Sequence, residues 1–142
     1  MLCIKPLIDN LKLPSKAHED DAGWDIFSLE TITIHPKERY KFSLGFAVIG
    51  ERGKMYKIEG KSGLAKHYGI DTIGNIIDSN YRGEISAILL NTGEYSIIIN
   101  KGDKICQLII HLIDDDGVLQ VYDKPIPKTS RGKQGFGSSG TS

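Results

Sequence analysis

Apolar and polar residues alternate with a period of two in several short stretches of the chain. Residues 31–34 read Thr-Ile-Thr-Ile, and Phe42, Leu44, Phe46 and Val48 recur at every second position. A period of two places such residues on one face of a β-strand. Further strands are expected in three later stretches: around Ile85, Ala87 and Leu89, in 95–99 and in 105–112.

The segments between these stretches are rich in Gly, Asn, Asp and Pro, which are typical of turns. Many short strands joined by such turns predict an all-β sandwich, jelly roll or barrel. No long stretch has helical periodicity. One short helix is expected from Ser62, because a Ser side chain can cap the backbone of residues 63–66.

Composition narrows the class of protein. The chain has 142 residues, enough for one domain with its own core, and 18 basic and 18 acidic residues, so its net charge is zero. We expect no nucleic-acid partner, because a protein held by phosphate contacts needs a basic surface. No apolar run suits a signal peptide or a membrane span. Cys3 and Cys106 show no pairing pattern, so both are expected to be reduced, in the cytoplasm or a cytosol-like compartment of a host cell.

The chain divides by composition into a body, 1–127, and a tail, 128–142, in which ten of fifteen residues are Gly, Ser or Thr. Composition alone favours a mobile tail, since one ring cannot offset the entropy of ordering it. The alternative is an arm that closes over a ligand. Arg131 would then carry charge to an anion, Phe136 would stack on a flat group, and glycine N–H groups would approach phosphate oxygens.

Two segments could carry chemistry. Residues 60–65, Gly-Lys-Ser-Gly-Leu-Ala, combine free N–H groups at a helix start with a Lys charge and could bind an anion. Residues 74–84 are interpreted as a β-hairpin with a partly buried Asp78, a candidate general base, and a flat ring at Tyr81. Taken singly, each segment is better explained as an ordinary capped turn or surface turn.

Acidic residues offer a weaker signal. Asp20, Asp21 and Asp25 could bind Mg²⁺ or form an acidic surface loop, and residues 114–116 are expected to be a solvated turn between strands. The four His residues lack ligand spacing, so no zinc site is predicted: His18, His35, His67 and His111.

The order of the motifs is more specific than any one of them. The chain resembles the trimeric dUTPase family in five motifs, in the family's order: 22–28, 60–65, 75–84, 102–109 and 131–140. The resemblance implies a distorted jelly-roll or β-barrel subunit with a flexible C-terminal arm closing over the active site. It also implies hydrolysis of dUTP to dUMP and pyrophosphate, which limits uracil in DNA. It implies Mg²⁺ as cofactor and a homotrimer with shared active sites.

The same resemblance implies roles for individual residues. Asp78 would activate the attacking water, Tyr81 would exclude a 2′-hydroxyl, and Asp25 would orient Mg²⁺ through water. The segment from Ile76 to Ser86 would hold uracil by backbone hydrogen bonds. The substrate-binding residues would be Lys61, Ser62, Gly63, Asn75, Ile77, Tyr81, Ser86, Gln107, Arg131, Phe136, Gly137, Ser138 and Ser139.

The chain departs from the family pattern at a few positions, where substrate binding could differ in strength. Lys61 replaces the usual Arg, which keeps the charge but loses the bidentate fork. Asn80 replaces a usual Asp. Asn75 stands where Gly is common, and Asn tolerates a left-handed backbone.

Two rival functions stay open. One is a dCTP deaminase of the same fold, which would need a proton-shuttling Glu, and Glu84 lies near the segment concerned. The other is a non-catalytic module that senses nucleotide or docks a regulatory protein.

Overall fold

The computed structural model describes residues 1–136 and residue 140, and most of its regular structure is β-strand. The elements are β1 (Ile4–Pro6), β2 (Trp24–Phe27), β3 (Ile32–Ile34), β4 (Arg39–Ser43), β5 (Phe46–Val48), β6 (Lys54–Glu59), α1 (Ser62–Tyr68), β7 (Ile70–Ile73), β8 (Ile76–Ile77), β9 (Ser86–Asn91), β10 (Ile97–Ile99) and β11 (Lys104–Leu112). The described part of the chain has no helix long and apolar enough to cross a membrane.

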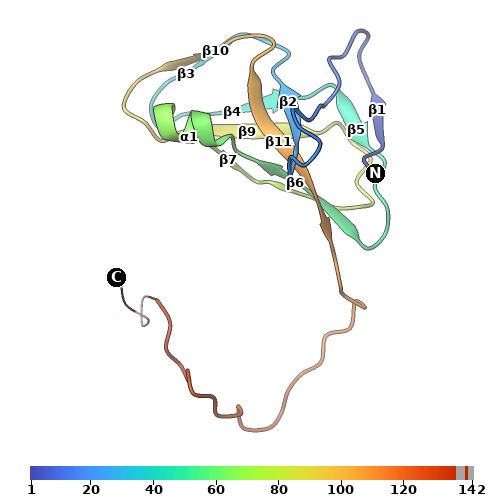
Figure 1. Cartoon of the computed structure of the whole chain (residues 1–142), viewed down its shortest axis with the longest axis vertical. Helices are drawn as coiled ribbons and strands as arrows, with labels where there is room; N and C mark the ends of the chain where they lie inside the picture. The colour runs from blue at the N-terminus through green and yellow to red at the C-terminus, as the bar shows by residue number, and fades with distance from the viewer. Residues whose placement is uncertain (137–139, 141–142) are drawn as a thin grey trace.

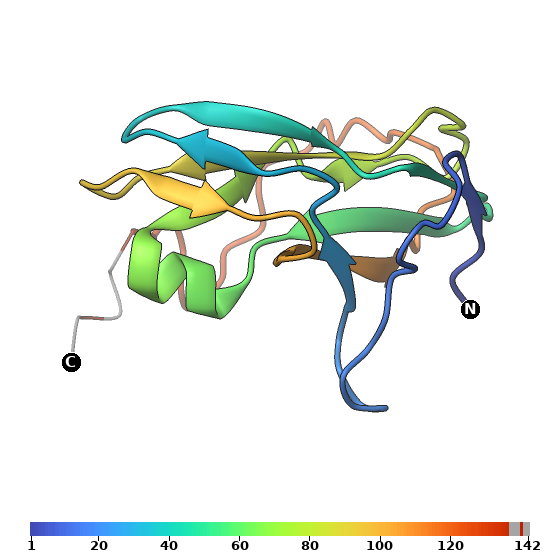
Figure 2. The ribbon, with the colours of Figure 1, turned by 90° about the horizontal axis from the view of Figure 1, so that it is seen from above.

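The strands pair antiparallel in two larger and two smaller sheets. The larger sheets have the orders β2-β11-β6-β8 and β4-β9-β7, and the smaller ones pair β1 with β5 and β3 with β10. The sheets are arranged in layers, with β4 and β9 over β6 and β11 and with α1 at one end (Figures 1 and 2). This arrangement confirms the all-β prediction.

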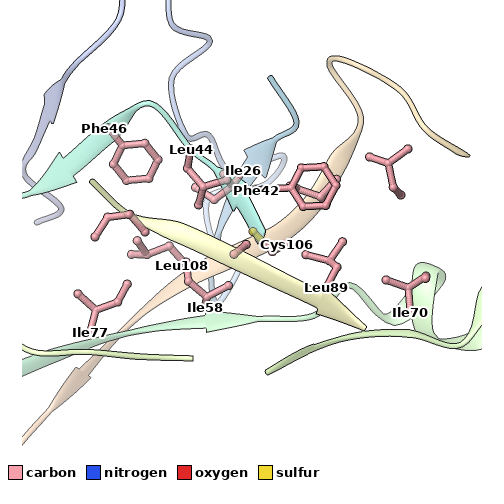
Figure 3. Packing of buried hydrophobic residues seen from close by; sticks show 14 of the residues in the cluster. Ile26, Phe42, Leu44, Phe46, Ile58, Ile70, Ile77, Leu89, Cys106 and Leu108 are labelled. Carbon is pink, nitrogen blue, oxygen red and sulfur yellow. The ribbon is translucent and has the colours of Figure 1, made fainter. Parts of the chain in front are cut away.

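The core fills the space between the two larger sheets. Phe42 and Leu89 come from one sheet and Ile58 and Leu108 from the other, and each is at most 2% exposed. Figure 3 shows these side chains facing one another across the interior. Burying a side chain of this size contributes about 1.5–3 kcal/mol. The period-two pattern of the sequence therefore does select the residues that face the core.

The long alternating run around residues 42–48 is not one strand. Gly45 has a φ of 77° and separates β4 from β5, which lie in different sheets. Alternation survives across the break, because Phe42, Leu44, Phe46 and Val48 are all buried. Glycine adopts the left-handed backbone conformation at the lowest energetic cost, so the chain changes direction at Gly45.

The segment 74–84 is not a β-hairpin, and that prediction is wrong. β8 pairs with β6, whereas β9 pairs with β4 and β7, so the two apolar runs belong to different sheets. Gly74, with a φ of 66°, turns the chain from one sheet to the other. Residues 78–85 form a loop that connects the two larger sheets.

The helix at Ser62 is confirmed, but its cap differs from the prediction. Lys61, not Ser62, is the N-cap residue, with extended backbone, and the helix start has no side-chain cap. Gly69 ends the helix in the left-handed conformation, with a φ of 68°. Ser62 therefore lies inside the first turn, and its hydroxyl is not used for capping.

The last described strand ends at Leu112, before the predicted division at 127/128. Residues 113–134 and Phe136 are exposed, and from Asp114 to Phe136 the described hydrogen bonds join residues close in sequence. Figure 1 shows this segment running away from the body. The turn at 114–116 is exposed, as expected, but no strand follows it among the described residues.

Candidate functional site

Asp25 is the centre of a charged cluster on the four-stranded sheet. Its side chain is almost buried, with the residue 6% exposed. Lys61 Nζ lies 2.5 Å from Oδ1 and Lys104 Nζ lies 2.8 Å from Oδ2. Each carboxylate oxygen faces a different ammonium group, so the carboxylate is held in one orientation. The cluster carries more positive than negative charge, which suits an anionic ligand.

Burial opposes the ionisation of Asp25, but its lysine partners outweigh that effect. Burial alone raises the pKa of the carboxyl group. The hydrogen bonds and charges of Lys104 and Lys61 lower it, and the net pKa is below its ordinary value. Asp25 is therefore a carboxylate at neutral pH. Each of its oxygens already accepts from one lysine and keeps a second lone pair that can accept from water.

Gln107 lies beside this cluster. It is opposite Asp25 of β2 and opposite Glu59 of β6, and its Nε2 donates to the Gly60 carbonyl oxygen at 3.0 Å. A Cβ atom at Gly23 would lie 2.7 Å from Gln107 Oε1, so glycine leaves room for the amide. Gln107 and Lys61, from separate predicted motifs, are brought together as expected.

Lys104 belongs to the cluster but was missed by the sequence analysis. A strict period of two would put Lys104 and Gln107 on opposite faces of β11. The strand register shifts between Lys104 and Cys106, and this β-bulge turns Lys104 to the face of Asp25 and Gln107. A bulge has no reliable signal in one sequence, although the residue lies within the motif 102–109.

The start of α1 supplies backbone donors next to Lys61. The Ala65 N–H donates to the Lys61 carbonyl oxygen, while the N–H groups of Ser62, Gly63 and Leu64 have no acceptor within the helix. A Cβ atom at Gly63 would meet no described atom within 4 Å. The predicted anion-binding segment therefore faces open space beside the lysine cluster.

Asp78 lies at the start of the loop 78–85 and borders two hollows. The smaller, of about 250 Å³, has apolar and polar lining that includes Ile76, Ile77, Tyr81, Glu84, Ile85 and Ser86. The larger, of about 530 Å³, has basic lining that includes Arg52, Lys54 and Arg82. Asp78 itself is exposed, so the expectation of a partly buried carboxylate is wrong for the single chain. Its backbone has just left β8, and no sheet covers it.

Tyr81 is held against its own loop. Its hydroxyl donates to the Glu84 carbonyl oxygen at 3.2 Å. A Cβ atom at Gly83 would lie 2.5 Å from Tyr81 Cζ, so only glycine lets the ring fold this closely. The ring therefore forms a fixed wall of the smaller hollow.

The residues beside this hollow are fixed by sheet pairing. Ile77 pairs with Tyr56 of β6, and Ser86 pairs with Ser43 of β4. Asn75 is not left-handed, contrary to the expectation, because the left-handed residue is Gly74. Asn75 Nδ2 donates weakly to the Thr72 carbonyl oxygen at 3.4 Å, and its buried Oδ1 has no partner among the described atoms.

Asp78 and the lysine cluster lie at opposite ends of β6. Ile77 is opposite Tyr56, so Asp78 lies beside Met55 at the start of the strand, whereas Lys61 follows the end. Six extended residues separate these points by roughly 20 Å. A triphosphate chain is much shorter than this distance. The structure therefore does not bring Asp78 together with Lys61 and Gln107 within one chain.

The C-terminal segment does not close over its own body. Arg131 Nε donates to the Gln134 carbonyl oxygen at 3.0 Å, and Phe136 is fully exposed. Gly137, Ser138 and Ser139 lie outside the described residues. Neither hollow beside Asp78 is lined by Arg131 or Phe136.

The described residues contain no group of three or more His, Cys, Asp or Glu side chains that could hold a metal ion. Asp20 and Asp21 precede β2 and form no such group with Asp25, which is buried within β2. One carboxylate is nevertheless enough for Mg²⁺ when waters and substrate phosphates supply the other ligands. Asp25 fits that kind of site and not an all-protein cage.

Cys106, beside Gln107, is not a nucleophile. It is 0% exposed, and burial raises the pKa of its thiol to about 12.

Comparison with known proteins decides the family. A family model described as dUTPase matches residues 9–140. A deoxyuridine 5′-triphosphate nucleotidohydrolase of Paramecium bursaria Chlorella virus 1 is 41% identical over 98% of this chain and 97% of its own. The corresponding Zymomonas mobilis protein is 39% identical over 92% of this chain and 90% of its own. The chain belongs to the dUTPase family.

Solved structures agree with this assignment. A Staphylococcus bacteriophage 80alpha dUTPase, in complex with dUpNHpp, has a TM-score of 0.87 at 28% identity and covers 99% of both chains. A dUTPase of the S. aureus phage phi11, described with a structural Mg(II) ion, has a TM-score of 0.77 at 26% identity and covers 85% of this chain and 96% of its own. The jelly-roll β fold expected from the sequence is thereby confirmed.

Proposed function

We propose that this chain hydrolyses dUTP to dUMP and pyrophosphate. The observation that carries the proposal is the environment of Asp78, an exposed carboxylate at the rim of a hollow that has one aromatic wall and backbone from two sheets. Relatives at 41% and 39% identity are named deoxyuridine 5′-triphosphate nucleotidohydrolases, which supports the same substrate here.

The smaller hollow would hold the deoxyuridine. Backbone groups at Asn75, Ile77 and Ser86 can pair with the uracil edge because sheet pairing fixes two of these residues. Tyr81 would lie against the deoxyribose, where its ring, fixed by Gly83 and the Glu84 carbonyl group, leaves no room for a 2′-hydroxyl.

The cluster at the other end of β6 would hold the phosphate chain. Lys61, Gln107 and the backbone N–H groups of Ser62 and Gly63 offer a cation and hydrogen-bond donors in one place. Asp25 would orient Mg²⁺ through water, and the ion supplies positive charge against the phosphate oxygens. Arg131, Phe136, Gly137, Ser138 and Ser139 would close over the nucleotide as an arm.

The separation of the two groups supports a site shared between chains. Asp78 and Lys61 lie roughly 20 Å apart along β6, too far to contact one phosphate chain. Another copy of the chain can supply the missing half, and closed cyclic symmetry would repeat the same site around the assembly. A homotrimer with three such sites is our proposal for the active form.

The chemistry follows from this assembly. Asp78 takes a proton from a water molecule, the water oxygen bonds to the α-phosphorus, and the bond to the bridging oxygen breaks. Pyrophosphate leaves on the side opposite the attacking water. Lys61 and Gln107 offset the negative charge that would repel the nucleophile, and the closed arm excludes bulk water.

Pyrophosphate release tests the function directly. With Mg²⁺ present, we expect release from dUTP and much slower release from dCTP, dTTP and UTP. Asp78→Asn should lower kcat by about 10³-fold, the usual contribution of a general base. Its melting temperature should match wild type, because Asp78 is exposed. No release from dUTP by an intact assembly would reject the enzyme, and deamination of dCTP would favour the deaminase.

A regulatory role is a second candidate. The phage 80alpha dUTPases, at 28% identity, are described as controlling transfer of virulence genes by a G protein-like mechanism. If this chain acts in that way, Asp78→Asn should lose turnover and keep its effect in cells. Loss of both together would mean that the cellular effect depends on hydrolysis and would reject a separate regulatory role.

A further inference from the structure

The loop 78–85 carries Asp78 and Tyr81. Its last residue, Ile85, donates its N–H to the Phe46 carbonyl oxygen of β5 at 2.8 Å and accepts the Leu44 N–H at 3.0 Å, whereas residues 78–84 make no described backbone hydrogen bond to a strand. Its ends are fixed, since β8 pairs with β6 and β9 pairs with β4 and β7. Between those ends, its internal backbone hydrogen bond runs from the Tyr81 N–H to the Asp78 carbonyl oxygen, at 3.1 Å. One such bond does not fix the stretch from Asp78 to Glu84, so side chains must hold the shape of that stretch.

Arg82 supplies those contacts. Its Nη1 donates to the carbonyl oxygens of Ser79, at 2.7 Å, and Tyr81, at 3.1 Å, and its Nη2 donates to the Gly50 carbonyl oxygen at 3.3 Å. The planar guanidinium group therefore ties the residues between Asp78 and Tyr81 to the turn between β5 and β6. A Lys ammonium has no planar fork and could not reproduce this pattern.

Gly50 allows the loop to approach that turn closely. A Cβ atom at Gly50 would overlap the Ser79 carbonyl group and lie 2.9 Å from the Ser79 Cα. The obstacle is backbone, not a movable side-chain tip. Gly50 and Arg82 thus both determine where Ser79 lies: Arg82 binds its carbonyl oxygen, and Gly50 leaves space for its backbone. The two residues can be substituted separately.

Glu84 makes a second connection at the far end of the loop. Its Oε1 accepts the Gly45 N–H at 2.9 Å, so the carboxylate fixes the loop to the turn between β4 and β5. The hydrogen bond from the Gly45 N–H gives the Glu84 carboxylate a structural role in the fold. This argues against the proton-shuttling role that a deaminase would require of Glu84.

We propose that Arg82 is a positioning residue, which holds Asp78 at the place and angle that the attack on the α-phosphate requires. The proposal rests on the proposed function. It predicts a specific separation of effects, because uracil would be held by β8 and Ser86, which the sheets fix without Arg82. Loss of the Arg82 contacts should therefore slow the chemical step and leave nucleotide binding nearly unchanged.

The test combines four variants of the full chain in its native assembly. Arg82→Met removes the fork, Arg82→Lys keeps the charge, and Gly50→Ala pushes the loop from the other side. Arg52→Met is the matched control, since Arg52 lines the same hollow and makes no side-chain hydrogen bond within the described residues. The measurements are kcat for dUTP, the Kd of the α,β-imido analogue of dUTP, and the melting temperature.

We expect kcat to fall about 10- to 100-fold in Arg82→Met and in Gly50→Ala, the range that a displacement near 1 Å produces. Arg82→Lys should fall between Arg82→Met and wild type. The Kd of the analogue should stay within about threefold in all four variants, and Arg52→Met should turn over normally. Because Arg82 is exposed, its variants should melt close to wild type.

Three results would overturn the proposal: an unchanged kcat in Arg82→Met, a Kd that weakens as much as kcat falls, or an equal loss in Arg52→Met. The last would assign the effect to charge at the hollow and not to the hydrogen-bonded fork. Failure of the proposed function looks different, because wild type would then release no pyrophosphate from dUTP.

Discussion

The two ends of strand β6 carry different parts of one proposed reaction, and they are built in different ways. At one end, Asp25 is nearly buried and bonded to Lys61 and Lys104, with Gln107 beside it. At the other end, Asp78 is exposed and belongs to a loop. The first group is complete within the chain. The second borders two hollows that the chain itself does not fill.

This difference shows which parts of the site a single chain can define. A buried carboxylate must be paired where it folds, because an unpaired charge at that position would be strongly destabilising. An exposed carboxylate is solvated by water and needs no paired cation in its own chain. Its contacts can therefore come from a partner chain or from the substrate. Roughly 20 Å of β6 keeps the two groups apart, and only an assembly would join them.

After the loss of Asp78, the largest effect is expected from a change in the cluster of Asp25, Lys61 and Lys104. Lys61→Met removes a cation from the phosphate cluster and should lower kcat/KM for dUTP about 10- to 100-fold, the value of a charge-assisted hydrogen bond. The steady-state kinetics of Lys66→Met provide the control. Lys66 lies in the last turn of α1 and makes no ion pair among the described residues. Equal, small losses in both variants would remove Lys61 from the site.

A smaller effect concerns stability at acid pH. Because the pKa of Asp25 is lowered in the folded chain, its contribution to the free energy of unfolding is fully present above its ordinary pKa of 3.8. That contribution is lost as pH falls through the lower folded value. As pH falls below 3.8, wild type should therefore lose more stability than Asp25→Asn in denaturant titrations. Parallel curves would contradict the ion-paired cluster.

The smallest effect should come from restoring the usual Arg. Lys61→Arg regains a bidentate fork for phosphate oxygens and should lower KM for dUTP by about two- to fivefold with kcat little changed. Initial-rate measurements over a range of dUTP concentrations would show this. A higher KM would mean that the space between Asp25 and the helix start fits only an ammonium group.

Much of the fold follows from local pattern. Period-two alternation identifies the core-facing residues of β4, β5 and β9, and Ser62 marks the helix, although Lys61 occupies the cap position. The pairing of the strands is not local. Ile76 and Ile77 join β6, and the strand that begins at Ser86 joins the other sheet, although the two runs lie close in sequence. Turn residues predict that a chain reverses, but not which sheet the next strand joins.

The site shows the same limit. The family resemblance assigned Lys61 and Gln107 to substrate binding and Asp25 to Mg²⁺, and the structure places the three residues side by side. Lys104 was missed because a β-bulge reverses its face, and Asp78 was expected to be partly buried because it follows an apolar pair. Bulges and exposure depend on contacts between distant segments, which one sequence does not display.

Mixed assemblies test the central claim, that each site combines Asp78 of one chain with Lys61 of another. By this account Asp78→Asn is nearly inactive, and Lys61→Met keeps only about 1 to 10% of the wild-type kcat/KM for dUTP. When the two are unfolded and refolded together, about one site in four should contain both intact residues by random assortment, and dUTP hydrolysis should reappear. If the mixture stays as inactive as the separate variants while forming the same oligomer, the two residues act within one chain, and the shared site is wrong.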